Sequence, residues 1–279
     1  MSYYIDYHIH SRHSTDAVSS IHEICQWALN SGLKEIAVTD HFEPSKGDAF
    51  YTAYDQKGYW AEIIKAKQQF KGKLEVKLGV ELGQPHLFKE GSLAILKDFP
   101  YDYVIGSAHK MESGKDMSEI DYSNISMDDV CSLYLKQLDR LLEFENFDCV
   151  GHMDLIKRYS AGTYGKNLSL ASQYELLTQV FRKLIQSGKG IEINTSGLRQ
   201  TPKETMPGLD VLKIYRTLGG EILTTGSDSH RAEDVGKGIR VAYELAESAG
   251  FDYVTTFTDR RPKQISIHPK KLFQPVMAR

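Results

Sequence analysis

The chain has 279 residues, of which 41% are hydrophobic and 25% charged, and its formal net charge is -3 at pH 7. These proportions are typical of a globular protein with a buried core, and the small negative charge argues against binding to nucleic acid or to an anionic membrane. The sequence does not begin like a signal peptide, and no stretch approaches the ~18 apolar residues that a membrane span needs. We therefore expect a soluble, cytoplasmic protein.

The three cysteines, Cys25, Cys131 and Cys149, are widely spaced and form no CxxC pair. An odd and sparse set is typical of a reducing compartment and indicates no disulfide framework. Because each lies in an apolar or helical segment, we expect all three in the core.

Strands and helices are predicted in alternation along the chain. Ser20 and Glu23 form a capping box that starts a helix ending at Gly32. The predicted strands are at residues 3–8, 35–39, 76–80, 102–105, 148–151, 191–194, 222–226 and 253–257. Further helices are predicted at about 59–70, 126–144, 170–185, 209–218 and 233–249.

This alternation predicts a parallel sheet covered by helices, and seven or eight such units favour closure into a barrel. The length suits one α/β barrel domain over residues 1–279. A long loop at residues 43–58, with Tyr51, Tyr54 and the adjoining Tyr59, is a candidate lid over the barrel mouth.

Histidines and carboxylates follow almost every predicted strand. In chain order these are His8 and His10, Asp40 and His41, Glu81, His109, His152 and Asp154, Glu192 and Asn194, and Asp228 and His230. The carboxyl ends of parallel strands open onto one face of a barrel, so residues far apart in sequence converge there. Two residues apart on a strand, His8 and His10 point to the same side.

A single buried histidine is more often a hydrogen-bonded core residue than a metal ligand. Six histidines on one rim reverse this expectation, because buried ionisable groups without partners are costly. Imidazole and carboxylate ligands together suit Mn²⁺, Fe²⁺ or Zn²⁺. The pattern therefore predicts a site for divalent metal ions.

The other four histidines carry weaker signals. His13 lies in a loop beside the predicted site, and His22, His86 and His268 are interpreted as structural or surface residues. Asp16 stands in a Ser-Thr-Asp-Ala loop that turn chemistry alone would explain.

The motifs His-Ile-His, Val-Thr-Asp-His, Leu-Gly-Val-Glu, Ser-Ala-His, Gly-His-Met-Asp and Gly-Ser-Asp-Ser-His, in this order, resemble the polymerase and histidinol phosphatase (PHP) family of phosphoesterases. The resemblance covers nearly the whole chain, and its spacing is similar to that of stand-alone histidinol-phosphate phosphatases. It implies a distorted (β/α)7 barrel and hydrolysis of L-histidinol phosphate to L-histidinol and phosphate, a step of histidine biosynthesis.

The resemblance also implies three divalent ions (Mn, Fe or Zn). The first ion would bind His8, His10, Glu81 and Asp228; the second would share Glu81 and bind His109 and His152; the third would bind Asp16, His41 and His230. This ligand set promotes Asp16 to a predicted ligand. Asp228 and His230 are the residues expected to take part in catalysis.

The implied mechanism is attack on phosphorus by a hydroxide that bridges two metals. The resemblance places Arg158 and Arg199 as phosphate-binding arginines, although either could be a solvated loop residue. Asp40, Asp154 and Glu192 are expected to orient the imidazole rings.

Three other functions compete with this hypothesis. A phosphodiesterase, exonuclease or nucleotide phosphatase of the same family is disfavoured by the acidic charge and the lack of a basic, aromatic-rich stripe. An amidohydrolase would need a metal-bridging lysine where this chain has His109 followed by Lys110. The complete ligand set disfavours a non-catalytic metal-binding module. We expect a small phosphate ester as the ligand; the oligomeric state does not follow from these patterns.

Overall fold

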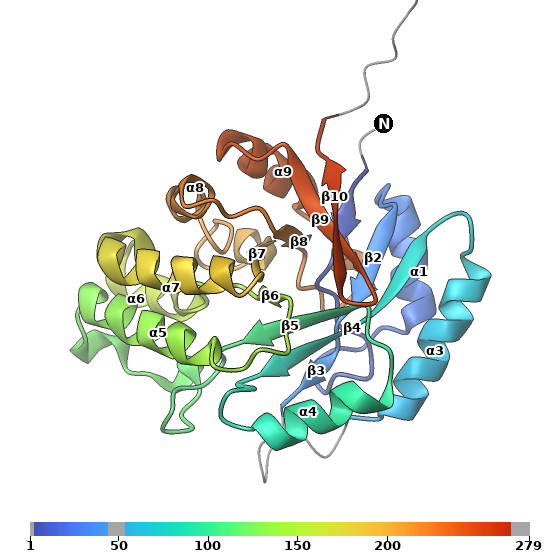
Figure 1. Cartoon of the computed structure of the whole chain (residues 1–279), viewed down its shortest axis with the longest axis horizontal. Coiled ribbons are helices and arrows are strands. Elements are labelled where there is room, and N and C mark those ends of the chain that lie inside the picture. The colour runs from blue at the N-terminus through green and yellow to red at the C-terminus, as the bar shows by residue number, and fades with distance from the viewer. Residues whose placement is uncertain (1–2, 44–53, 269–279) are drawn as a thin grey trace, which may run out of the picture.

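The computed structural model describes residues 3–43 and 54–268. A sheet of parallel strands occupies the centre, with helices around it (Figure 1). In spatial order the strands are β1 (Ile5–Asp6), β2 (Glu35–Val38), β4 (Glu75–Gly83), β5 (Tyr103–Ser107), β6 (Cys149–Val150), β7 (Gly190–Asn194) and β8 (Leu223–Gly226). The short β3 (His41–Phe42) pairs in parallel with the second half of β4.

Hydrogen bonds between the segments that follow β1 and β8 bring the sheet back on itself. The amide of Asp228 donates to the carbonyl of His8 at 2.8 Å, and the amide of His10 donates to that of Ser229 at 2.9 Å. The strands thus form a nearly closed barrel, and the predicted distorted (β/α)7 fold is confirmed.

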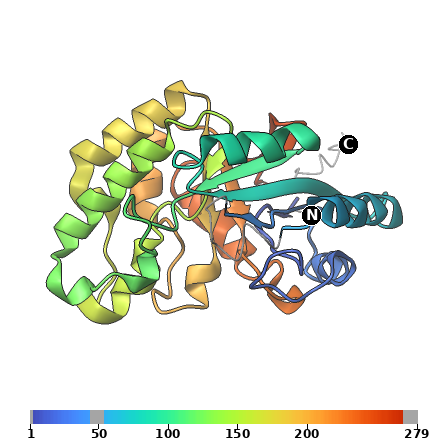
Figure 2. The same ribbon diagram turned by 90° about the horizontal axis from the view of Figure 1, so that it is seen from below.

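The helices pack around the outside of this barrel, as Figures 1 and 2 show from two directions. They are α1 (Ile21–Asn30), α3 (Gln56–Gln69), α4 (Lys89–Asp98), α5 (Met127–Leu141), α6 (Ile156–Tyr164), α7 (Tyr174–Gln186), α8 (Leu209–Thr217) and α9 (Ile239–Ser248). The capping box of Ser20 and Glu23 starts α1 as predicted. Within the described residues, none of the helices combines the length and the apolar character that crossing a membrane demands.

Within residues 3–43 and 54–268, two helices were not predicted, and one starts later than predicted. The residues before α4 and α6, Phe88 and Leu155, give no side-chain cap, so neither helix has a starting signal. The helix predicted from residue 233 begins only at α9, because Gly236 and Gly238 both adopt a φ of +79°. A positive φ is incompatible with a continuous right-handed helix.

The last predicted strand does not belong to the barrel. β9 (Tyr253–Thr258) pairs in antiparallel fashion with β10 (Arg261–Ser266) to form a hairpin. The hairpin lies against the residues at which barrel strands begin: the amide of Arg260 donates to the carbonyl of Asp102, and the amide of Leu223 donates to Thr255 Oγ1. It therefore covers the end of the barrel opposite to the strand carboxyl ends.

Most of the candidate lid, residues 44–53 with Tyr51, lies outside the described residues. Tyr59 is part of α3, fully buried, and donates from its hydroxyl to the carbonyls of Val38 and Gly79. Tyr59 therefore anchors α3 on the barrel, and its inclusion in a lid was wrong. Cys25, Cys131 and Cys149 are free and buried, as predicted.

Candidate metal centre

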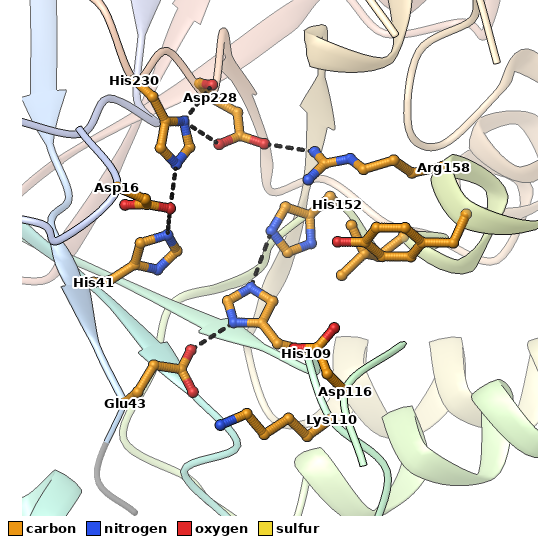
Figure 3. A pocket seen from close by; sticks show the side chains of 12 residues that line it. Asp16, His41, Glu43, His109, Lys110, Asp116, His152, Arg158, Asp228 and His230 are labelled. Atoms are coloured by element: carbon orange, nitrogen blue, oxygen red, sulfur yellow. Dashed lines mark hydrogen bonds and ion pairs between the residues drawn. The ribbon is translucent and has the colours of Figure 1, made fainter. Parts of the chain in front are cut away.

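The nine predicted metal ligands lie around one pocket at the carboxyl ends of the strands. His41 is in β3 and Glu81 is in β4, whereas the other ligands follow strand ends or lie in the adjoining loops. Figure 3 shows Asp16, His41, His109, His152, Asp228 and His230 around this pocket. His8, His10 and Glu81 are fully buried behind these residues.

Glu81 is the carboxylate at the centre of the cluster. Its oxygens lie 3.3 Å from His8 Nε2, 2.9 Å from His41 Nδ1, 3.2 Å from His109 Nε2 and 3.0 Å from His152 Nε2. A carboxylate that faces imidazoles with both oxygens is placed to bridge two cations. This is the position that the predicted shared ligand requires.

Asp228 is a second carboxylate, and it faces the same two imidazole nitrogens of His8 and His10 as Glu81 does. Its Oδ1 lies 3.8 Å from His8 Nε2 and 3.5 Å from His10 Nε2. The backbone at Asp228 has a φ of +51° and that at His152 a φ of +23°, which non-glycine residues rarely adopt. Strain of this kind is concentrated at functional sites, where the surrounding structure maintains it.

Asp16 lies at the exposed edge of the cluster. Its Oδ2 is 3.5 Å from His41 Nε2 and 3.0 Å from His230 Nε2, and its side chain is 41% exposed. The loop therefore brings this carboxylate to the two histidines with which it was grouped.

A divalent metal ion would satisfy the polar atoms of these side chains better than their contacts with one another do. Within the described part of the chain, His8 Nε2, His10 Nε2 and Glu81 Oε2 are buried without a well-formed hydrogen bond, and they face one another and neighbouring ligand atoms at 2.9–3.8 Å. Native proteins rarely leave such atoms unsatisfied, because each costs free energy. Four overlapping groups of three side chains each offer ligand atoms within 4.8 Å of one another. These groups are His8, Glu81 and His152; His8, His10 and Asp228; His41, Glu81 and His109; and His10, His41 and His230.

The charge states of these groups depend on burial and on the neighbouring carboxylates. Burial lowers the pKa of His10 and of His152, which leaves both imidazoles neutral. Burial also opposes protonation of His41, but Glu81 and Asp16 outweigh it and raise the pKa of His41 to about 10. The pKa of Glu81 itself is held well below its usual range, because the surrounding imidazoles outweigh the effect of burial. A metal that binds here must displace protons.

Other carboxylates hold the imidazole rings from behind. Glu192 Oε1 lies 2.8 Å from His8 Nδ1, as predicted. Asp40 acts through Ser14, whose hydroxyl donates to Asp40 Oδ1 at 2.7 Å and lies 3.3 Å from His10 Nδ1.

The expected role of Asp154 is not seen. Its Oδ2 lies 2.9 Å from the buried amine of Lys157, three residues further along the chain, and within residues 3–43 and 54–268 neither carboxylate oxygen forms a hydrogen bond or an ion pair with an imidazole. The Lys157 amine also lies 3.2 Å from Glu204. Asp154 therefore fixes the start of α6 through this ion pair.

Sequence reasoning missed Glu43, which contacts His109. Glu43 Oε1 lies 2.6 Å from His109 Nδ1, and Glu43 Oε2 accepts from Gln84 Nε2 at 2.7 Å. The carboxylate lies so close to Gly83 that a Cβ there would overlap it. No motif marks Glu43; only its place directly after β3, beside β4, could have suggested it.

The two predicted arginines lie in different places. Arg158, in α6, lines the pocket and donates from Nη2 to Asp228 Oδ2 at 2.8 Å (Figure 3). Arg199 is not among the pocket-lining residues; its Nη2 donates to the carbonyl of Ser227 at 2.7 Å, while its buried Nη1 has no hydrogen-bond partner. Arg158 thus lies in the pocket beside Asp228, whereas Arg199 lies behind the backbone that carries Asp228.

The remaining histidines have partners away from the cluster. His13 lies 3.6 Å from Glu62, His22 contacts Gln69, His86 contacts Gln137 and His268 contacts Asp252. The pocket is also lined by Lys110, Asp116, Leu155 and Tyr159, which sequence reasoning did not single out as a site.

The chain is similar to known proteins over most of its length. The PHP domain family matches residues 6–196. The histidinol-phosphatase of Lactococcus lactis is 31% identical over 271 residues, which cover 94% of this chain and 98% of that protein. A Clostridium acetobutylicum protein named "Probable histidinol-phosphatase" is 31% identical and covers 87% of this chain and 92% of its own length.

A solved structure is similar over the same range. The crystal structure of histidinol phosphate phosphatase from Lactococcus lactis, complexed with zinc, L-histidinol and phosphate, has a TM-score of 0.82 to this chain at 28% identity. It covers 93% of this chain and 98% of its own. By its sequence and its fold, the chain belongs to the PHP domain family.

Proposed function

We propose that this protein is a metal-dependent phosphomonoesterase that hydrolyses L-histidinol phosphate to L-histidinol and phosphate, a step of histidine biosynthesis. The observation that carries this is the buried Glu81, which faces four imidazoles; three of them, those of His41, His109 and His152, line a pocket that Arg158 also lines. The similarity over nearly the full length to a histidinol phosphate phosphatase supports the substrate.

The proposed site holds three divalent ions. His8, His10, Glu81 and Asp228 would bind the first; Glu81, His109 and His152 the second; Asp16, His41 and His230 the third. The contacts of Glu81 with His109 and His152, and of Asp16 with His41 and His230, fit this division, whereas the 2.9 Å contact between Glu81 and His41 crosses it; the division itself comes from the family resemblance. When bound, such ions lower the pKa of water and neutralise phosphoryl oxygens.

The protein's own side chains would then orient and neutralise the substrate. Arg158 would bind the phosphate through guanidinium N–H groups that do not bind Asp228, since a planar fork of donors suits phosphate oxygens. Binding of phosphate by Arg199 stays a prediction, because Arg199 does not line the pocket and its Nη1, which has no hydrogen-bond partner among the described residues, is buried. Asp228 contacts both His230 and Arg158, which supports the proposed catalytic role of Asp228 and His230.

Phosphate release by the Mn²⁺-loaded protein tests this function. L-histidinol phosphate would be compared with other phosphomonoesters, with nucleotides and with a phosphodiester. We expect a kcat/KM of roughly 10⁴ M⁻¹s⁻¹ or more for histidinol phosphate and much lower values for the others. Preferred turnover of the diester or of nucleotides would be compatible with the proposed metal site but would contradict the proposed substrate.

A further inference from the structure

One part of the pocket wall plays no role in the site described so far. Asp116, Leu155 and Tyr159 line the pocket together with the metal-site residues. In Figure 3, Asp116 lies on the far side of the pocket from Asp16 and His41. A substrate whose phosphate is held at the metal cluster would direct the rest of its structure toward other parts of this wall.

Four carboxylates line the pocket, and Asp116 differs from the other three. Asp16 and Glu43 contact metal-site histidines, and Asp228 contacts Arg158 as well. Asp116 Oδ1 instead accepts from the amide and the hydroxyl of Ser118, at 2.8 and 2.6 Å. Among the residues that the structure describes, none forms a hydrogen bond or an ion pair with Asp116 Oδ2. One oxygen of this carboxylate is therefore available to a cation in the pocket.

The backbone around Asp116 is fixed to the strand end that carries His109. The amide of Met117 donates to the carbonyl of His109 at 2.9 Å, and Asp116 forms an isolated antiparallel bridge with Lys110. Met117 is fully buried, and its carbonyl accepts from the Tyr122 hydroxyl at 2.7 Å. The carboxylate is thus held relative to the metal cluster before any ligand binds, which lowers the entropy cost of binding.

We propose that Asp116 binds the ammonium group of the substrate and makes the enzyme selective for phosphomonoesters that carry an amine near the phosphate. The inference rests on the proposed function, because L-histidinol phosphate has an amino group two carbons from the ester oxygen. Arg158 and the metal cluster bind the anionic end, and Asp116 binds the cationic one. Leu155 and Tyr159 offer apolar surface to the carbon chain between them.

The test compares Asp116→Asn with a matched control, Asp121→Asn. Asp121 makes a similar local cap, since its Oδ1 accepts from the amide and the hydroxyl of Ser123 and its Oδ2 from Asn124, but it is exposed and does not line the pocket. Both variants would be assayed with O-phosphoethanolamine and ethyl phosphate, which differ only in the ammonium group, and with L-histidinol phosphate. Circular dichroism and metal content would be measured for each variant.

We expect Asp116→Asn to lower kcat/KM for the two amines about 10- to 100-fold, mainly through KM, and to leave ethyl phosphate within about 2-fold. Asp121→Asn should leave all three substrates unchanged. An equal loss on ethyl phosphate, or no loss on the amines, would overturn the role of Asp116. Failure of the unaltered enzyme on histidinol phosphate would instead reject the proposed function, while the ethanolamine pair would still decide the role of Asp116.

Discussion

The two ends of the barrel each bury a glutamate, and they treat it in opposite ways. At the end covered by the β9–β10 hairpin, Glu35 accepts from the hydroxyls of Tyr7 and Tyr3 at 2.5 and 2.9 Å. At the other end, Glu81 Oε1 accepts from Ser107 Oγ at 2.6 Å, but among the described residues its Oε2 faces only imidazole nitrogens. A buried charge with its own partners stabilises the fold, whereas one with unused lone pairs indicates a ligand.

The largest expected effect comes from exchanging these two carboxylates for amides. Glu81→Gln should lower kcat for phosphate release about 10³-fold or more, because an amide cannot bridge two cations. Metal content, measured by elemental analysis, should fall with it. Glu35→Gln is the matched control: we expect kcat within about 2-fold of the original and a melting temperature lower by about 2–8 °C. Loss of activity in Glu35→Gln at full metal content would contradict the conclusion that Glu35 serves only the fold.

Glu43 is not a predicted metal ligand but contacts one, His109. A substitution of Glu43 tests whether such a carboxylate contributes to the site. Glu43→Gln weakens the contact with His109, so metal affinity or kcat should fall about 10- to 100-fold. Glu90→Gln, an exposed glutamate in α4, is the control and should change neither quantity. Titration with Mn²⁺ followed by activity separates the two variants. Identical titration curves would show that Glu43 does not support His109.

The pH dependence of stability should separate the metal-free protein from the loaded one. Glu81 and Asp16 outweigh burial and raise the pKa of His41 to about 10 in the folded, metal-free chain. A group whose pKa is raised in the folded state stabilises that state, and the full contribution is present below the unfolded-state pKa of about 6.5. The contribution is lost as the pH rises through 10. Bound metal needs His41 without its proton, so alkaline pH favours binding.

Melting temperatures measured from pH 7 to about 10 would show whether the metal-free protein loses stability in this range, as expected. The chelator-treated protein should lose several degrees more than the Mn²⁺-loaded protein, roughly 5 °C. Glu81→Gln should show a smaller slope without metal, since it lacks the main charge that holds the proton on His41. Parallel curves for the two forms would contradict the assignment of His41.

The smallest expected effect is at the covered end. Tyr3→Phe removes one of the two hydroxyls that donate to Glu35, and it should lower the free energy of unfolding by about 1 kcal/mol. Urea unfolding measures this change, and phosphate release should stay the same. A change in kcat would mean that the two ends of the barrel are coupled.

Much of the fold and of the site could be predicted because the signals are local. His8 and His10 stand two residues apart at a strand end, and Glu81 ends an apolar run, so their convergence follows from barrel geometry. The helix α1 carries its own start signal in Ser20 and Glu23. The assignment of each ligand to a particular ion came only from the resemblance and stays a prediction, as do the single domain and the cytoplasmic location.

What could not be predicted depends on contacts between segments far apart in sequence. Glu43 reaches His109 only because β3 pairs with β4 and Gly83 leaves room for the carboxylate. From the sequence, residues 253–257 look like an eighth barrel strand, because a single apolar run does not show which strand it pairs with. Asp154 pairs with Lys157 because α6 starts between them, and α6 itself has no capping signal.

The hydrogen bonds that join residues 8–10 to residues 228–229 have a consequence for synthesis on the ribosome. When β7 has emerged, seven of the nine predicted ligands already exist in the nascent chain, yet Asp228 and His230 do not. The segment with His8 and His10 then has no neighbour on its open side. The site for the first ion can therefore be completed only after β8 is made, so full metal loading should be one of the last events in the maturation of this protein.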